Sequence, residues 1–183
     1  MEAAFAWIGW IFEWLGKLIP RLLIVRSTHG GVKFVGGSKV KELKPGLHVY
    51  WPVVTEVEVI PVARQTHNLV TQVLMTKDGK SIVIGAVVIY EINSIVDALS
   101  NNWDVSDTIS DVTQMAVVNI VNGWDFAELQ KELGAKVENE LSIETRRQLK
   151  PFGVKVIRCG VSDFSLCRVH RVITDAEGVG LKR

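Results

Sequence analysis

The side chains best able to do chemistry are spread thinly along the 183 residues. Cys159 and Cys167 form no CxxC pair, and the four histidines stand singly at positions 29, 48, 67 and 170. Neither set has the spacing of a zinc site or a disulfide scaffold, so we expect two reduced thiols and ordinary polar histidines. Acids at 97, 104, 107 and 111 lack the spacing and the turn glycine of an EF-hand loop. They are expected to form a solvated helix face.

Catalytic motifs are also missing from the sequence. It contains no P-loop, no GxGxxG after a strand, no HExxH and no GxSxG. We therefore expect a non-enzymatic protein with no catalytic residues, no metal and no cofactor. The net charge of +1 excludes a uniformly basic nucleic-acid binder, and the 48% hydrophobic content excludes a disordered chain.

Indole side chains are concentrated at the amino end, where Trp7, Trp10 and Trp14 are half of the six tryptophans. Residues 3–19 form an apolar run that, as a helix, would be about 26 Å long, slightly short of a hydrocarbon core of ~30 Å. The three indoles fall at the polar edge of this helix, a position typical of the headgroup level of a bilayer. Residues 1–20 are therefore predicted to form an amphipathic helix that inserts into a membrane, lying in the interface or spanning it marginally. The predicted membrane-binding residues are Phe5, Trp7, Ile8, Trp10, Ile11, Phe12, Trp14, Leu15, Leu18 and Ile19. The alternatives are an amphipathic core helix and a signal peptide, the latter disfavoured because the amino end carries Glu2 and no cation.

Charge is segregated along the chain. Residues 17–44 hold seven Lys or Arg against one acid, whereas residues 95–144 hold ten acids against two lysines. A basic block directly after an apolar segment suits an anionic leaflet and predicts that the folded domain lies on the cytoplasmic side. Lys17, Arg21 and Arg26 are the predicted anionic-lipid contacts. The other interpretation of the basic block is that its lysines are solvated turn residues that contact nothing. The acidic block is expected to face a basic surface of a neighbouring copy.

The periodicity of the remaining chain predicts both strands and helices. Runs rich in Val and Ile predict strands over 22–28, 32–35, 47–51, 55–62, 69–75, 81–92 and 154–161. Gly79 predicts a hairpin turn over 77–80, and strand 81–92, apolar in both alternating sets, is expected to be covered on both faces. Helices are predicted over 95–101, from a cap at Asp104 to Gly123, and over 125–149 behind a capping box at Asp125. Residues 168–183 are expected to form a loose polar tail.

Several short motifs resemble a known family when they are taken in order. Residues 36–48 (GGSKVKELKPGLH), then Pro52, then residues 76–83 (TKDGKSIV) leading into 88–90 are similar to the stomatin/prohibitin/flotillin (SPFH, band 7) domain. The closing Gly153-Val-Lys-Val strand is similar too, and the resemblance covers roughly residues 22–166. It implies an α+β fold, with a twisted, mainly antiparallel sheet and packed helices, preceded by the membrane helix. The expected domain is 21–166, followed by a polar tail at 167–183, and the chain is expected to be a minimal member that lacks the family's long carboxy-terminal coiled coil.

The resemblance also implies a function. It predicts a membrane-attached, self-assembling scaffold whose large rings or cages organise lipids or enclose and regulate membrane proteins. The expected partners are further copies of the chain, the lipid bilayer, and a membrane protease or channel, with no nucleic acid. The alternative is a soluble binding module or inhibitor that docks its Trp-rich helix in a groove of a partner protein.

Overall fold

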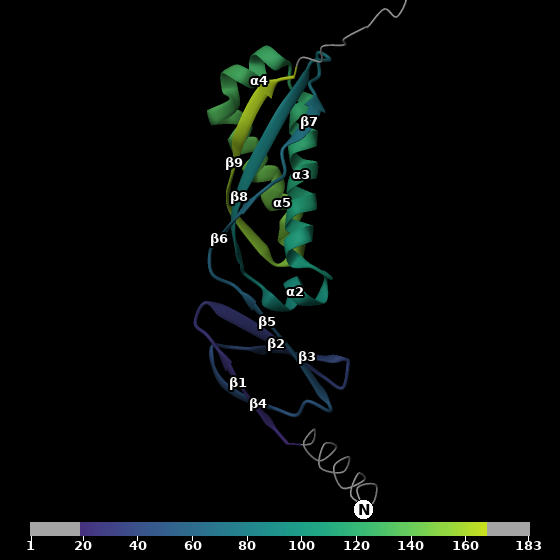
Figure 1. Ribbon diagram of the computed structural model, residues 1–183, viewed down its shortest axis with the longest axis vertical. Helices are drawn as coiled ribbons and strands as arrows, with labels where there is room; N and C mark the ends of the chain where they lie inside the picture. The colour runs from purple at the N-terminus through teal and green to yellow at the C-terminus, as the bar shows by residue number, and fades with distance from the viewer. Residues whose placement is uncertain (1–18, 168–183) are drawn as a thin grey trace, which may run out of the picture.

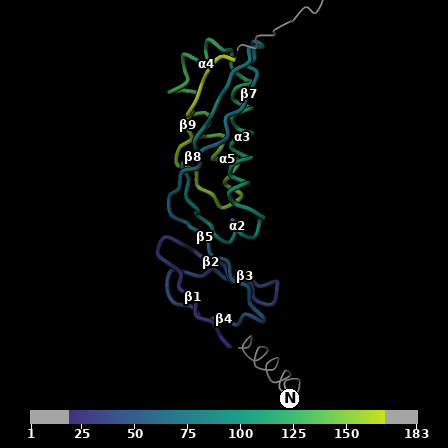
Figure 2. Tube along the Cα trace, viewed as in Figure 1, coloured from purple at the N-terminus to yellow at the C-terminus, as the bar shows by residue number. Residues whose placement is uncertain are grey.

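The computed structural model describes residues 19–167, which form an elongated molecule with two parts arranged end to end (Figure 1). The first part, which we call the short-strand module, contains the first five strands; its bounds are β1 (Arg21–Val25), β2 (His29–Val35), β3 (Lys39–Leu43), β4 (Gly46–Tyr50) and β5 (Thr55–Pro61). Figure 2 shows that these strands gather at the end where the described chain begins.

The second part, the long-sheet module, contains the longest strands and all the described helices. Its strands are β6 (Gln65–Asn68), β7 (Gln72–Met75), β8 (Ser81–Ile92) and β9 (Val154–Leu166). Its helices are α2 (Ile95–Ser100), α3 (Val105–Gly123), α4 (Phe126–Glu132) and α5 (Glu138–Leu149), with a π-helical turn η2 (Leu133–Val137) and a 3-10 turn η3 (Lys150–Phe152). The architecture is α+β with antiparallel sheets, as the family resemblance implied.

Antiparallel pairing organises both modules. In the short-strand module, β1 pairs with β4, and a separate sheet has the order β3-β2-β5. In the long-sheet module, β8 pairs with β6 and β7 along one edge and with β9 along the other. The β8–β9 register runs from Ile82 opposite Leu166 to Ile92 opposite Val154 and is interrupted by irregularities at Gly85/Ala86 and Ile89/Tyr90. Such bulges increase the local twist of a long strand pair.

The core lies between the long sheet and helices α3 and α5. Every second side chain of β8 from Ile82 to Ile92 is buried there, together with Ile109, Leu141 and Leu149 from the helices. The opposite face of β8 carries Val83, Val87 and Ile89, which are only half-buried. The prediction that strand 81–92 is covered on both faces was therefore wrong, because among residues 19–167 no helix packs against that second face (Figure 1).

Helix α5 also occupies the outer edge of β9 with side chains spaced four residues apart. Glu138 Oε1 accepts a hydrogen bond from Val161 N at 3.2 Å, and Ser142 Oγ accepts one from Cys159 N at 2.9 Å and donates to the Cys159 carbonyl at 3.1 Å. Arg146 Nε donates to the Val156 carbonyl at 3.1 Å. Residues at i, i+4 and i+8 lie on one face of a helix, so one helix face supplies the partners that a further strand would otherwise supply.

The β7–β8 turn is joined to the start of α4 by Asp78. Its Oδ1 accepts hydrogen bonds from Thr76 Oγ1 at 2.6 Å and from the backbone N of Phe126 at 3.0 Å, and its Oδ2 lies 3.1 Å from Lys80 Nζ. The hydrogen bond from Thr76 and then that from Phe126 lower the pKa of Asp78 to about 2. The predicted Gly79 turn is confirmed, with φ at +78°, but the predicted capping box is wrong. Asp125 occupies the N-cap position without a side-chain hydrogen bond, and the backbone N of Phe126 donates to Asp78.

Other local predictions were correct or shifted in their bounds. Asp104 caps α3 by accepting from Ser106 N at 2.7 Å and Asp107 N at 3.1 Å, as predicted. The single helix predicted over 125–149 is divided by η2. The strand predicted over 22–28 ends at Val25, that over 69–75 is confined to 72–75, and that over 154–161 continues to Leu166. Strands β3 and β6 were not predicted.

Candidate membrane-docking surface

The β1–β4 pair presents one face made entirely of aliphatic side chains. Leu22 lies opposite Val49, and Ile24 lies opposite Leu47. Directly opposed residues of an antiparallel pair point to the same side, as do residues two apart in one strand. These four side chains therefore share a face, which we call the aliphatic face. Their exposed fractions are 69% for Leu22, 73% for Ile24, 63% for Leu47 and 55% for Val49.

The other face of the same pair is turned toward the protein. Val25 is buried, and Leu23, His48 and Tyr50 are half-buried. The module thus buries one side of the two-stranded ribbon and leaves the other side to solvent, although both sides carry large apolar residues. A contiguous exposed apolar patch of this kind marks a surface that another apolar phase or a partner covers.

The loop that follows β4 extends the apolar surface. Trp51, Val53 and Val54 are exposed by 49%, 63% and 57%. The backbone N of Gly36 donates to the Val54 carbonyl at 2.9 Å, which fixes this loop against the β2–β3 turn. An indole beside aliphatic residues is the composition that prefers the boundary between headgroups and hydrocarbon.

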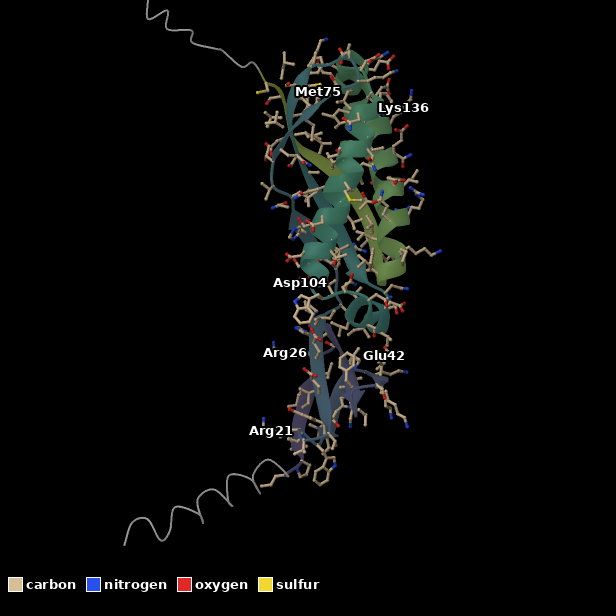
Figure 3. All side chains as sticks on the ribbon, turned by 90° about the vertical axis from the view of Figure 1, so that its right-hand side faces the viewer. Arg21, Arg26, Glu42, Met75, Asp104 and Lys136 are labelled. Carbon is tan, nitrogen blue, oxygen red and sulfur yellow. The ribbon has the colours of Figure 1, made fainter. Side chains whose placement is uncertain are left out.

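The predicted lipid-contact residues that the structure describes are Ile19, Arg21 and Arg26. Ile19 is 62% exposed and directly precedes β1, and Arg21 is exposed at the first position of that strand, opposite Tyr50. Figure 3 shows Arg21 near the end of the molecule where the described chain begins, with Arg26 farther along toward the long-sheet module. The structure thus places Ile19 and Arg21 at the start of β1 and Arg26 just after its end. Because Arg21 lies opposite Tyr50, it shares the ribbon face that is turned away from the aliphatic face.

The remaining predicted membrane-binding residues lie outside the described part of the chain. They are Phe5, Trp7, Ile8, Trp10, Ile11, Phe12, Trp14, Leu15, Lys17 and Leu18. Between residues 19 and 167, no helix has the length and apolarity needed to cross a bilayer.

Sequence reasoning did not identify the aliphatic face. It predicted strands over 22–28 and 47–51 without assigning their apolar side chains a surface role. A signal was present, because the run Leu22-Leu23-Ile24-Val25 is apolar at both alternating positions in a strand of a two-stranded sheet. Two strands cannot bury both of their faces unless a further layer covers each one.

Several titratable groups elsewhere are engaged in the fold. Burial raises the pKa of the Cys159 thiol to about 12, so this cysteine remains protonated and unreactive at neutral pH. The pKa of Glu91 is lowered by a hydrogen bond from Lys155 at 2.7 Å, and that of Glu144 by hydrogen bonds from Arg147. Within residues 19–167, no three His, Cys, Asp or Glu side chains gather as they would around a metal ion.

Fold and surface together define a small α+β domain whose candidate site is a docking surface at one end of an elongated molecule. The sequence profile of the SPFH domain / Band 7 family matches residues 23–176, and the chain belongs to this family. SPFH domains serve in general as non-enzymatic scaffolds, and their proteins are typically membrane-associated.

Similar proteins occur in archaea, and each of the three compared is named only as uncharacterized. A protein of Archaeoglobus fulgidus is 25% identical over 163 residues, which cover 87% of this chain and 64% of the relative. One of Methanocaldococcus jannaschii is 20% identical over 146 residues, 80% of this chain and 73% of the relative. One of Methanothermobacter thermautotrophicus is 24% identical over 139 residues, 75% of this chain and 43% of the relative. The match thus spans less than two thirds of the first and third relatives.

Proposed function

We propose that this chain is a membrane-attached scaffold that assembles with copies of itself into large rings or cages. In this proposal residues 1–20 insert into the bilayer as an amphipathic helix, residues 21–166 form the folded domain on the cytoplasmic side, and residues 167–183 are a polar tail. The observation that carries the proposal is the aliphatic face, which lies in the module that directly follows residues 1–20. The membrane association typical of the family supports the same role.

Two anchors fix orientation better than one. A terminal helix alone would allow the domain to rotate about a flexible joint, whereas a second apolar contact within the domain restricts that rotation. The aliphatic face and Trp51 would enter the interfacial region, and Arg21 and Arg26, together with Lys17, would contact anionic headgroups. Because the short-strand module lies at one end of an elongated molecule (Figure 1), this docking would direct the long-sheet module away from the bilayer.

An upright, elongated subunit is suited to forming a wall. Copies standing side by side on a membrane would enclose an area of bilayer, and a membrane protease or channel inside that area would be separated from its surroundings. The chemistry that this role requires is apolar and electrostatic docking, which matches a family that is generally non-enzymatic. Nucleic acid has no part in the proposal.

Flotation of the full chain with vesicles tests the proposal. The protein is mixed with vesicles of phosphatidylcholine, or of phosphatidylcholine and phosphatidylglycerol, and centrifuged through a density gradient. We expect flotation with both, and more with the anionic vesicles at low salt, because cations near an anionic surface each contribute about 1 kcal/mol. Protein that stays at the bottom with both vesicles would exclude membrane attachment. Electron microscopy of the floated fraction then tests for closed rings.

A further inference from the structure

A cleft lies where the two modules meet. It has a volume of about 240 Å³ and is formed by β5, the start of β6, the end of β8, α2 and the first turn of α3. Part of its wall is apolar and includes Ile60, Tyr90 and Leu99. We call it the Trp103 cleft after a further residue of its lining. Pockets for drug-sized ligands measure about 300–1,000 Å³, so this cleft suits a smaller molecule.

The charged residues of the lining are both acids. Glu58 and Asp104 are exposed, and the lining contains no Lys, Arg or His. Within residues 19–167, neither carboxylate belongs to an ion pair. Two carboxylates beside an apolar wall create a negative potential that attracts a cation. The charge of the cleft therefore favours a positively charged ligand.

The register of the small sheet places Glu58 on the same side as the apolar wall. Glu58 and Ile60 are two residues apart in β5 and therefore point to the same side. Ile60 lies opposite Gly30 of β2, and a Cβ added to Gly30 would lie 2.7 Å from Ile95 Cδ1 at the start of α2. This side of β5 therefore faces α2, so Glu58 and the apolar wall can contact one ligand together.

Trp103 adds to the lining an indole that has no packing of its own. Its side chain is fully exposed, whereas a large aromatic side chain usually buries much of its area. The segment that carries it is held on both sides, because Asn102 Nδ2 donates to the Ala98 carbonyl at 2.9 Å and Asp104 caps α3. The backbone of Trp103 is thus positioned before a ligand binds, which lowers the cost of binding. The face of the indole remains available to a cation.

We propose that the Trp103 cleft binds a small quaternary ammonium cation such as choline. The positive charge would be attracted to Glu58, Asp104 and the face of Trp103, and the methyl groups would lie against the apolar wall. A primary ammonium suits this wall less well, because its N–H groups would lose their hydrogen bonds to water there. The bound cation would contact β5 of one module and the α2–α3 segment of the other. This inference goes beyond the proposed scaffold role and does not depend on it.

A trimethylammonium group occurs in free solutes and in the phosphatidylcholine headgroup, and the position of the cleft favours a free solute. The aliphatic face belongs to β1 and β4, which lie at the end of the molecule away from the long-sheet module (Figure 1). Figure 3 shows Asp104 in the middle of the molecule, well away from Arg21 at that end. Headgroups of a bilayer docked on the aliphatic face would therefore lie away from the cleft.

Ligand-observed NMR on the full chain in micelles of dodecyl maltoside tests the proposal. Choline is compared with ethanolamine, which has the charge without the methyl groups, and with dimethylbutanol, its uncharged carbon isostere. Binding is followed by the broadening of the ligand's proton signals as protein is added. We expect saturable binding of choline and affinities lower by about fivefold or more for both analogues. Glycerophosphocholine, the soluble headgroup, should also bind more weakly than choline, because its phosphate is repelled by the two acids; tighter binding would overturn the assignment to a free solute.

Substitutions show whether the cation binds at this cleft. Trp103→Ala should weaken choline binding about 2- to 30-fold, and Trp103→Phe should weaken it less, because a phenyl ring still attracts a cation. Glu58→Gln should weaken it about twofold to fivefold, with a larger loss at low salt. Both side chains are exposed, so the urea midpoint of each variant should match that of the parent chain. Met115→Ala on α3 and Glu128→Gln on α4, exposed residues outside the cleft, are the matched controls.

Three results would overturn the proposed site. The parent chain would leave the choline signals unbroadened, or it would bind dimethylbutanol as tightly as choline, which would mean an apolar cavity indifferent to charge. Unchanged choline affinity in both Trp103→Ala and Glu58→Gln would place the binding elsewhere. Saturable binding that weakens from Trp to Phe to Ala at position 103, and on Glu58→Gln, would support the site. Flotation and assembly are separate measurements, so failure of this test leaves the scaffold proposal standing.

Discussion

Replacing Ile24 and Leu47 with serine removes one cross-strand pair from the aliphatic face, and we expect it to weaken membrane binding strongly. Full burial of a Leu or Ile side chain contributes about 1.5–3 kcal/mol. Because Ile24 and Leu47 are 73% and 63% exposed, each has about 1–2 kcal/mol still to gain on entering lipid. The pair should therefore contribute about 2–4 kcal/mol, which is a fall of about 30-fold to several hundred-fold in the partition coefficient.

The assay is a lipid titration of the full chain. Each variant is mixed with increasing amounts of phosphatidylcholine/phosphatidylglycerol vesicles, and the bound fraction is measured after sedimentation. Val70→Ser with Val73→Ser is the matched control, because these residues are 77% and 62% exposed but lie at or beside β7, at the far end of the molecule (Figure 1). That control should bind like the parent chain.

Membrane docking of the aliphatic face would be refuted if Ile24→Ser/Leu47→Ser changed the partition coefficient little, or if the control pair changed it equally. A partition coefficient within about twofold of the parent value would mean that the aliphatic face stays out of the bilayer, since tenfold corresponds to about 1.4 kcal/mol. Equal losses for the control pair would mean that any exposed apolar residue contributes. Urea unfolding should show little change for Ile24→Ser/Leu47→Ser, because the lost cross-strand contact is worth only about 0.2–1 kcal/mol.

Three further predictions concern stability and reactivity. Asp78→Asn should lower the free energy of unfolding at pH 7. Folding lowers the pKa of Asp78 from 3.8 to about 2, so this carboxylate stabilises the fold above about pH 4. In urea titrations the difference in stability between the two chains should therefore shrink between pH 4 and pH 2. Ser142→Ala should cost about 1–3 kcal/mol in the same urea assay, because it leaves buried backbone groups of β9 without partners; no loss would mean that the β9 edge is satisfied otherwise. A thiol reagent at pH 8 should modify Cys167 and leave Cys159, with a pKa of about 12, unmodified until urea unfolds the domain; equally fast labelling of both would contradict the assigned burial.

Sequence reasoning succeeded where the determining interactions are local. The Gly79 turn and the Asp104 cap depend on residues within three positions of each other, and β8 and α3 have long, clear periodicities. Strand β3 was missed because four of its five residues are exposed and three are charged, so it carries no buried alternation. Its strand conformation comes from pairing with β2.

Non-local contacts explain the remaining differences. The acceptor at the start of α4 comes from Asp78, 48 residues before Phe126, so the Asp125 pattern could not reveal it. Apolar membrane-facing residues were expected only in the amino-terminal run, because a strand pattern does not indicate which of two apolar faces another layer covers. The pairing of Leu22 with Val49 and of Ile24 with Leu47 supplies that information.

The β3-β2-β5 sheet and the long β8–β9 sheet differ in how their edges are covered, and this difference bears on the risk of misassembly. A protein concentrated on a membrane meets its own copies often, and open strand edges then favour uncontrolled growth of β-structure. The long β8–β9 pair is guarded along much of its outer edge by Glu138, Ser142 and Arg146. The β3-β2-β5 sheet, within residues 19–167, pairs with no further strand at either edge, and its strands are short and charged. Crowding would thus bring copies together at the β3-β2-β5 sheet. Growth of the assembly would stop at specific contacts there and would not spread along β8 and β9.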